Sequence, residues 1–95
     1  GSLRMDLSDG HAYLNNADTG LTRTEFSLLR LLAENQEKIF SAKELYEAAW
    51  GSCARADTST VRRHIFNLRT KIGAEDTDEY DIVSVYGKGY LFTCR

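Results

Sequence analysis

The sequence predicts an α+β fold in which three helices lie between two antiparallel β-hairpins. Three observations point to this fold. Runs typical of β-strands stand near both ends of the chain, two capping-box sequences open helices in the middle, and a third helical stretch carries an apolar stripe. A chain of 95 residues is long enough for one such domain with a modest core and too short for two.

The first hairpin is predicted at the N-terminus. Residues 3–7 alternate apolar and polar side chains, which is the period of a half-buried strand. An Asp-Gly pair follows, and this pair is a strong hairpin-turn signal. Residues 11–16 would form the returning strand, in which His11 is interpreted as an exposed strand residue rather than a ligand. Residues 15–20 are rich in turn-forming residues and are expected to form a turn.

Two capping boxes, Thr22–Glu25 and Ser41–Glu44, predict the starts of the first two helices. The first helix is apolar around most of its circumference, so it is predicted to be the central core helix, ending near Asn35. The second helix is expected to run to about residue 50, where Gly51 suits its C-terminal end. The residues that the second helix is expected to bury are Leu45, Ala48, Ala49 and Trp50.

The third helix, residues 58–72, combines a narrow apolar stripe with a broad polar face. On a helical wheel the stripe consists of Val61, Ile65, Leu68 and Ile72. The opposite face carries Arg63, Phe66, Asn67 and Thr70, with Arg62 and Arg69 on one flank and His64 and Lys71 on the other. A helix that enters a DNA major groove needs this layout, because its middle reads base edges and its sides meet phosphates. A surface helix with a solvated charged face has the same layout, so this stretch alone leaves both interpretations open.

The segments around the third helix complete the prediction. Residues 52–57 are predicted to form a loop, and Asp57 or Thr58 can cap the helix that follows. Three short helices joined by tight loops, the last of them basic, match the helix-turn-helix plan. The acidic residues 74–80 are expected to form a solvated loop, and the β-rich runs 81–85 and 90–94 to form a hairpin with a lysine in its turn. The turn glycines are not a phosphate-binding loop, because no helix follows them.

The charge of the chain is unevenly distributed. The total is −2, but residues 54–72 hold five cations and one anion, a net charge of +4. Local basic density, rather than the total charge, sets the electrostatic footprint of a protein on a phosphate backbone. A nucleic-acid partner is therefore compatible with the acidic total.

Several other classes of protein are disfavoured by the sequence. Cys53 and Cys94 show no staple pattern and are interpreted as reduced thiols of a cytoplasmic protein, and the absence of CxxC or HxxxH spacing argues against a structural zinc site. No metal or cofactor is expected, and no Ser/His/Asp or Cys/His set for an enzyme can be placed in one cleft. No apolar run is long enough to cross a membrane. Gly1-Ser2 is interpreted as a cloning remnant, so the domain is expected to span residues 3–95.

Four segments carry a family resemblance that covers nearly the whole chain from Leu3. They are Leu21–Phe26 with Leu28-Leu29, Ala49–Gly51, the pattern Val61, His64-Ile65, Leu68-Arg69 and Lys71, and Val83–Phe92 with its Gly-x-Gly-Tyr turn. In this order and spacing they resemble the C-terminal effector domain of the OmpR/PhoB-type two-component response regulators. Each segment alone is a weak signal, and the four together are a strong one.

The resemblance implies a winged helix-turn-helix with an N-terminal antiparallel sheet, a three-helix core and a C-terminal β-hairpin wing. It implies sequence-specific binding of double-stranded promoter DNA, with the recognition helix 58–72 in the major groove and the wing 81–94 at the minor groove. Such domains usually follow a phosphorylatable receiver domain, which is absent from this chain. The resemblance further implies an RNA polymerase contact through the loop 52–57, a tandem dimer on DNA and a monomer when isolated.

The family's functional positions fall on particular residues of this chain. Arg63 and Asn67 match base-reading positions, and Phe66 beside them could contact a thymine methyl group. The expected contacts to the DNA backbone are Thr60, Arg62, His64, Arg69, Thr70 and Lys71, and the expected wing contacts are Tyr86 and Lys88.

The chain also departs from the family, because Phe66, Asn67, Tyr86 and Leu91 stand where arginines are common. The binding face is therefore less cationic than usual, and Lys88 is the only obvious cation of the wing. A winged-helix module used for protein–protein contact is the alternative that the acidic total and Phe66 leave open. The salt dependence of duplex binding separates these two hypotheses.

Overall fold

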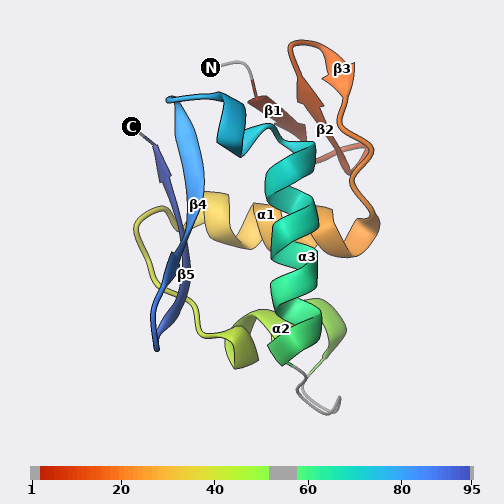
Figure 1. Cartoon of the computed structure of the whole chain (residues 1–95). Helices are drawn as coiled ribbons and strands as arrows, with labels where there is room; N and C mark the ends of the chain where they lie inside the picture. Colours follow the sequence, from red (N-terminus) through yellow and green to blue (C-terminus); the bar gives the residue numbers. More distant parts are fainter. Residues whose placement is uncertain (1–2, 52–57, 95) are drawn as a thin grey trace.

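The computed structural model describes residues 3–51 and 58–94, and residues 1–2, 52–57 and 95 lie outside this description. The predicted α+β fold is confirmed (Figure 1). The N-terminal sheet consists of β1 (Leu3–Asp6), β2 (His11–Leu14) and β3 (Ala17–Asp18). The helices are α1 (Arg23–Glu34), α2 (Ala42–Trp50), α3 (Thr58–Lys71) and the short 3-10 helix η1 (Ala74–Asp76). The C-terminal hairpin is formed by β4 (Tyr80–Val85) and β5 (Gly89–Cys94).

Helix α3 packs against α1, α2 and the C-terminal hairpin. In Figure 1, α1 and α2 cross behind α3, the N-terminal sheet lies at one end of it, and the C-terminal hairpin runs along its side. The hairpin strands are antiparallel, with Tyr80 opposite Cys94 and Val85 opposite Gly89. This arrangement leaves one long side of α3 open beside the turn of the hairpin.

The N-terminal sheet has one strand more than the sequence analysis predicted. Residues 15–20 were expected to form only a turn, but β3 lies within them and pairs antiparallel with β2, with Leu14 opposite Ala17. Asn15 and Asn16 form the connection, with φ values of 52° and 69°. Two consecutive residues at positive φ define the tight hairpin turn that matches strand twist, and asparagine tolerates this conformation. The two-residue turn at Asn15 and Asn16 therefore allows β3 to pair with β2, although the segment is so rich in turn-forming residues that no strand was predicted there.

The first strand is shorter than its alternating pattern suggested. It ends at Asp6, whose carboxylate accepts a hydrogen bond from the Ser8 amide at 2.9 Å. Leu7 therefore lies in the turn, and 54% of its surface is exposed. The prediction that the half-buried strand extends to this residue is wrong, because the hydrogen bond to the Asp6 side chain turns the chain before Leu7.

Both predicted capping boxes are present. The Thr22 and Ser41 hydroxyls accept the amides of Glu25 and Glu44, and each glutamate carboxylate accepts the amide of its capping residue in return. Helix α1 ends with Asn35 as its C-cap, as predicted, and Gly51 ends α2 with a φ of 98°. Local sequence therefore fixes these helix ends.

The apolar face of α2 differs in part from the prediction. Leu45 is fully buried, but Ala48 is exposed, and Trp50 is only partly buried. The Trp50 ring stacks on Tyr46 with centroids 4.7 Å apart and meets the edge of His64 at 4.9 Å. Helix α2 has only nine residues, and Leu45 is the one that it buries fully in the core. Trp50 therefore covers the margin of the core rather than filling its centre.

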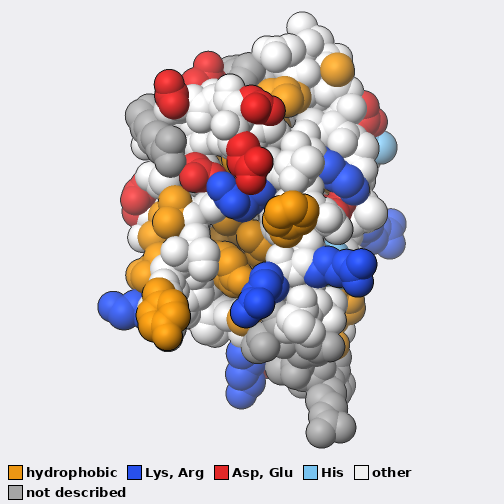
Figure 2. Space-filling model, in the orientation of Figure 1, with side chains coloured by type: hydrophobic (Ala, Val, Ile, Leu, Met, Phe, Trp, Pro, Cys, Tyr) orange, Lys and Arg blue, Asp and Glu red, His pale blue; other side chains and the backbone are white. Residues whose placement is uncertain are grey.

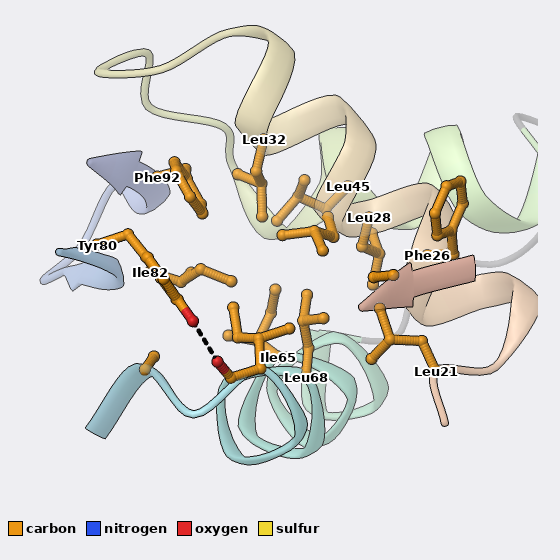
Figure 3. Close-up of a cluster of buried hydrophobic side chains, with 14 of the residues drawn as sticks. Leu21, Phe26, Leu28, Leu32, Leu45, Ile65, Leu68, Tyr80, Ile82 and Phe92 are labelled. Carbon is orange, nitrogen blue, oxygen red and sulfur yellow. Dashed lines mark hydrogen bonds between the residues drawn. The ribbon is translucent and has the colours of Figure 1, made fainter. Parts of the chain in front are cut away.

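The core joins α1, α2, α3 and the C-terminal hairpin (Figure 3). The predicted stripe of α3 is confirmed, since the exposed fractions are 0% for Val61, Leu68 and Ile72 and 3% for Ile65. Tyr80, which begins β4, is also buried and donates a hydrogen bond of 2.5 Å from its hydroxyl to the Ile72 carbonyl (Figure 3). This bond ties the end of α3 to the hairpin.

The C-terminal hairpin is also fastened to the segment that leads into α2. Phe40 and Tyr90 exchange two backbone hydrogen bonds, of 2.8 and 2.9 Å. The approach is so close that a Cβ atom at Gly89, where φ is 145°, would lie 1.9 Å from the Phe40 carbonyl oxygen. Only glycine fits this position. The turn of the hairpin is thereby held beside the first turn of α2.

Candidate nucleic-acid interface

The exposed face of α3 consists of Arg62, Arg63, Phe66, Asn67 and Thr70, all of which are exposed. The buried stripe on the opposite side holds this face toward solvent. Arg63 and Asn67 are four residues apart, so their side chains stack one turn from each other on the same side. Phe66 exposes 61% of its surface, which is unusual for a large apolar side chain in a small domain. The face therefore presents hydrogen-bonding and apolar groups side by side.

Charge is divided along this side of the molecule. Figure 2 shows Lys and Arg side chains over the lower part of α3 and beside the turn of the hairpin, and Asp and Glu side chains around η1 and the upper part of α3. The acidic segment 74–80 includes η1, and its four acidic side chains are exposed. An anionic partner is therefore favoured at the lower part of α3 and repelled at the other end.

Arg69 is held by two carboxylates of the chain itself. Its Nε and Nη2 atoms donate to the same oxygen of Asp81, at 3.3 and 3.2 Å, and its Nη1 atom lies 3.9 Å from Glu75. The Arg69 side chain is 30% exposed and that of Asp81 15%. This pair joins α3 to β4, so an Arg69 contact to a phosphate has to compete with Asp81.

Lys71 is likewise paired within the protein. Its Nζ atom lies 2.7 Å from Glu25, whose side chain is only 3% exposed. Burial alone would raise the pKa of the Glu25 carboxyl, but the hydrogen bonds from Lys71 and from the Thr22 amide outweigh burial and hold the pKa below its usual range. Glu25 is therefore charged at neutral pH and fixes Lys71 against the start of α1.

Of the four other predicted backbone contacts of α3, His64 and Thr70 make local hydrogen bonds within the helix. The His64 Nδ1 atom lies 2.8 Å from the Thr60 carbonyl, which can only accept, so Nδ1 carries the proton. The partly buried His64 ring also packs against Trp50. The Thr70 hydroxyl donates to the Phe66 carbonyl at 3.1 Å. His64 therefore sits beside the exposed face rather than within it, while Thr70 remains on that face.

The predicted wing residues lie in the turn of the C-terminal hairpin. Tyr86 is fully exposed, and Lys88 is exposed with its amide donating to the Val85 carbonyl at 3.0 Å. The turn is thus closed by its own backbone, while both side chains face solvent. A fully exposed aromatic ring makes no contribution to the core, so Tyr86 is available for contact with a partner.

A groove of about 470 Å³ separates α3 from the hairpin. Its apolar wall includes Ile65, Phe66 and Val83, and the Arg69–Asp81 pair lies at its surface. Figure 2 shows this hollow with hydrophobic side chains inside it. The groove brings the exposed face of α3 and the hairpin together along one side of the molecule, as a surface that has to meet a double helix would require.

Three charged residues of this region were not among the predicted site residues. Asp81 and Glu25 were assigned only to a strand and a capping box, although they hold Arg69 and Lys71. Lys43, in the first turn of α2, was given no role, although it lies beside the hairpin turn. The signal for Lys43 was its place at the start of α2, which is the first helix of the predicted helix-turn-helix pair, since the first helix of such a pair crosses the DNA backbone.

Within residues 3–51 and 58–94, no three His, Cys, Asp or Glu side chains are grouped so that they could hold a metal ion. Cys94 is a free, exposed thiol, and Cys53 falls outside the described residues. None of the helices in the described part of the chain has the length and apolar character needed to cross a membrane.

Known regulatory proteins are similar to this chain in sequence. The chain is 39% identical over 100 residues to "Probable transcriptional regulator ycf27" of Cyanidium caldarium, a match that covers 100% of this chain and 39% of the relative. It is 37% identical over 79 residues to the response regulator SaeR of Staphylococcus epidermidis, covering 83% of this chain and 34% of the relative. The chain thus spans well under half the length of these curated relatives.

A solved structure and a family model also match this chain. The DNA-binding domain of RstA from Klebsiella pneumoniae, in complex with the RstA box, matches with a TM-score of 0.80 and 26% identity, covering 98% of this chain and 92% of that one. The family model described as "Transcriptional regulatory protein, C terminal" matches residues 16–92. The chain therefore belongs to this family of regulatory C-terminal domains, and its relatives within it are the OmpR/PhoB-type response regulators.

Proposed function

We propose that this chain is the output domain of a transcriptional response regulator and binds double-stranded promoter DNA in a sequence-specific way. Helix α3 enters the major groove, and the turn of the C-terminal hairpin lies at the minor groove. The observation that carries the proposal is the exposed face of α3, which presents Arg63, Phe66 and Asn67 to solvent while the opposite stripe is fully buried. The major groove admits one helix and offers a distinct donor and acceptor pattern for each base pair.

The side chains in and beside this face divide into readers, which contact base edges, and anchors, which contact phosphates. Arg63 can pair bidentately with guanine and Asn67 with adenine, and Phe66 can contact a thymine methyl group. Arg62 and Lys88 are exposed, and neither forms an ion pair among the described residues, so both can meet phosphates directly. Arg69 and Lys71 reach phosphates only if they leave Asp81 and Glu25. The readers supply specificity, and the anchors supply most of the affinity.

The salt dependence of duplex binding tests the proposal. We expect the logarithm of the binding constant to fall with the logarithm of salt concentration with a slope between about −2 and −4, because Arg62 and Lys88 release counterions directly and Arg69 and Lys71 add to them only where they leave their carboxylates. Fluorescence anisotropy with a labelled promoter duplex at several salt concentrations measures this slope. A flat response would contradict DNA binding through this face.

The alternative function is a winged-helix module for protein–protein contact. It is favoured by the exposed aromatic rings of Phe66 and Tyr86 and by the net charge of −2. Under this alternative, duplex binding would be weak and indifferent to sequence, and removal of Phe66 would affect a protein complex instead. Selection of duplexes from a random pool discriminates between the two functions, because only the DNA-binding function enriches a site. An enriched direct repeat with centres about one helical turn apart would also identify a tandem arrangement.

The proposal extends to the protein of which this domain would be a part. Its partners would be a receiver domain in the full-length protein, a second copy in a tandem dimer on DNA, and RNA polymerase. The isolated domain would be a monomer, and the protein would act in the cytoplasm. The segment assigned to RNA polymerase, residues 52–57, lies outside the described residues. The relatives SaeR and ycf27 support this extension, because the chain matches only 34% and 39% of their lengths.

Asp81→Asn is expected to strengthen binding to specific and random duplexes alike, by about two- to fivefold near 0.1 M salt. The substitution removes a carboxylate next to the binding face and releases Arg69 to a phosphate, so the salt slope should become steeper by about one unit. Asp78→Asn is the matched control, because it makes the same change of net charge at an exposed position of the acidic segment. Weaker binding by Asp81→Asn would show instead that the pair is needed to hold α3 against β4.

A further inference from the structure

One edge of the C-terminal sheet has no neighbouring strand in the described part of the chain. The sheet consists of β4 and β5, and Phe40 extends it only on the β5 side, through its two hydrogen bonds to Tyr90. The other edge, that of β4, lines the groove of about 470 Å³ beside α3. An unpaired strand edge is a template on which another extended segment can form hydrogen bonds.

The backbone groups that this edge exposes follow from the pairing of β5. Tyr90 gives both its amide and its carbonyl to Phe40, so it does not exchange hydrogen bonds with Ser84, which lies opposite it. Antiparallel pairs alternate between bonded and non-bonded positions, so the backbone groups of Ile82 and Ser84 point away from β5. The Ile82 amide donates to the Asp81 carboxylate at 2.8 Å. The Ile82 carbonyl and the amide and carbonyl of Ser84 have no hydrogen-bond partner among the described residues, so three groups are available.

The sequence of β4 does not protect this edge. Sheets commonly protect an exposed edge with a lysine, a proline or a bulge. Strand β4 contains no lysine or proline, and its register with β5 is unbroken. Its only charged residue, Asp81, stands near its beginning and pairs with Arg69. Three of the next four residues are β-branched, so the second half of β4 is suited to pair with an additional strand.

Helix α3 forms the opposite wall of the groove, and its side chains differ in character along it. Arg62 lies at the end nearer the hairpin turn and forms no ion pair within residues 3–51 and 58–94. Phe66, which is 61% exposed, supplies an apolar surface farther along. At the other end, Arg69 is outnumbered by the carboxylates of Asp81 and Glu75. A partner lying along the groove therefore meets a cation, an apolar ring and a negative charge in that order.

We propose that this groove binds an extended peptide segment of a partner protein, which joins β4 as an added antiparallel strand. The segment carries an acidic, an apolar and a basic residue at alternate positions, so that all three side chains face α3. The acidic residue meets Arg62, the apolar residue packs on Phe66, and the basic residue meets Glu75. The inference goes beyond the proposed function, because the partner is a protein segment rather than DNA.

The dimensions of the two walls agree with this arrangement. The first and fifth residues of a strand lie about 13 Å apart, since each residue advances the strand by about 3.3 Å. Arg62 and Arg69 are seven residues apart in α3, which is roughly 10 Å along a helix. Long charged side chains at both ends of the peptide cover the difference. Five residues are therefore enough to reach all three parts of the wall.

The probe for the first experiment is the peptide Glu-Thr-Val-Thr-Lys, blocked at both ends, and the control is the charge-reversed Lys-Thr-Val-Thr-Glu. Strand β4 runs toward the hairpin turn, so an antiparallel partner begins at the turn and meets Arg62 with its first residue. Binding is measured from the amide resonances of residues 66 and 82–84. We expect the probe to bind about fivefold more tightly than the control, because the control places like charges together at both ends.

The second experiment tests for hydrogen bonds to the backbone of β4. In an antiparallel partner, amides that face β4 alternate with amides that face away. N-methylation of the peptide's valine should weaken binding by about fivefold, because the lost amide faces β4. N-methylation of either threonine should change binding less than twofold, because those amides face solvent. This alternation distinguishes an added strand from a peptide held only by its side chains.

The third experiment removes a backbone donor from the protein. Ser84→Pro deletes the amide that points into the groove and leaves the hydrogen bonds between β4 and β5 in place, as proline permits on an edge strand. It should weaken the probe by about fivefold. Ser84→Ala, the matched control, keeps the amide and should bind as the unmodified chain does. Thermal melts check the fold, and if Ser84→Pro does not fold, the N-methylated peptides decide the question with the unmodified chain.

The outcomes distinguish this inference from the proposed function. No binding of the probe, or equal losses on N-methylation of valine and threonine, overturns the inference. If Ser84→Pro binds the probe normally but binds duplex DNA less tightly, the groove belongs to the DNA surface, so the inference falls and the proposed function stands. Alternating losses in a chain that binds no duplex would support the inference and contradict the proposed function.

Discussion

Replacing Leu68 with alanine is expected to lower the free energy of unfolding by about 2–5 kcal/mol. Leu68 is fully buried on the stripe of α3, within the cluster that joins all three helices to the C-terminal hairpin. The substitution removes apolar surface from the core and leaves a cavity that the surrounding side chains fill only in part. Denaturant melts followed by circular dichroism measure the change. In a domain of this size, such a loss is a large fraction of the total stability.

The matched control is Phe66→Ala, two positions earlier on the same helix. Phe66 is 61% exposed, so its removal should change the free energy of unfolding by about 0.5 kcal/mol or less. A loss below about 1 kcal/mol for Leu68→Ala, or a larger loss for Phe66→Ala, would mean that the opposite face of α3 is buried. The proposed DNA face would then be wrong as well, because it is defined by the side that the core leaves open.

The parts of the fold that could be predicted from sequence are those with local signals. The capping boxes at Thr22 and Ser41 fixed two helix starts, and the period of apolar residues in α3 identified its buried side. The errors came from competing local bonds and from tertiary packing. Two asparagines at positive φ created β3, the carboxylate of Asp6 ended β1 early, and Tyr80 became a core residue by reaching Ile72. No periodicity in the sequence reports such contacts.

The candidate site shows the same limit. The helical wheel placed Arg63 and Asn67 on one exposed side, and the structure has them there. It could not show that Arg69 and Lys71 are already paired, because Asp81 and Glu25 lie 12 and 46 residues away in the chain. The wheel also gave no role to Lys43, which belongs to another helix. Which cations are free to contact phosphates therefore depends on tertiary contacts. Which side of α3 is exposed depends on the pattern of one helix alone.

Arg63→Ala and Asn67→Ala are expected to cost about 1–3 kcal/mol each on the preferred site and little on random duplex. Each side chain can form two hydrogen bonds with one base, guanine for arginine and adenine for asparagine, and those bonds are lost only where that base is present. Specificity should relax at one or two base pairs for each variant. Selection from a random pool, repeated with each variant, identifies those pairs.

The matched control for this pair is Arg62→Ala on the same helix. Arg62 is exposed like Arg63 but lines a hollow beside the hairpin turn, and its proposed contact is a phosphate rather than a base. Its removal should weaken specific and random duplexes equally and make the salt slope shallower by about one unit. Measuring the three variants on both duplexes at two salt concentrations separates reading from anchoring. Arg63→Ala could instead weaken both duplexes equally while Arg62→Ala alters the base preference. That result would mean that α3 enters the groove rotated by about one residue, with Arg62 as the reader and Arg63 as the anchor.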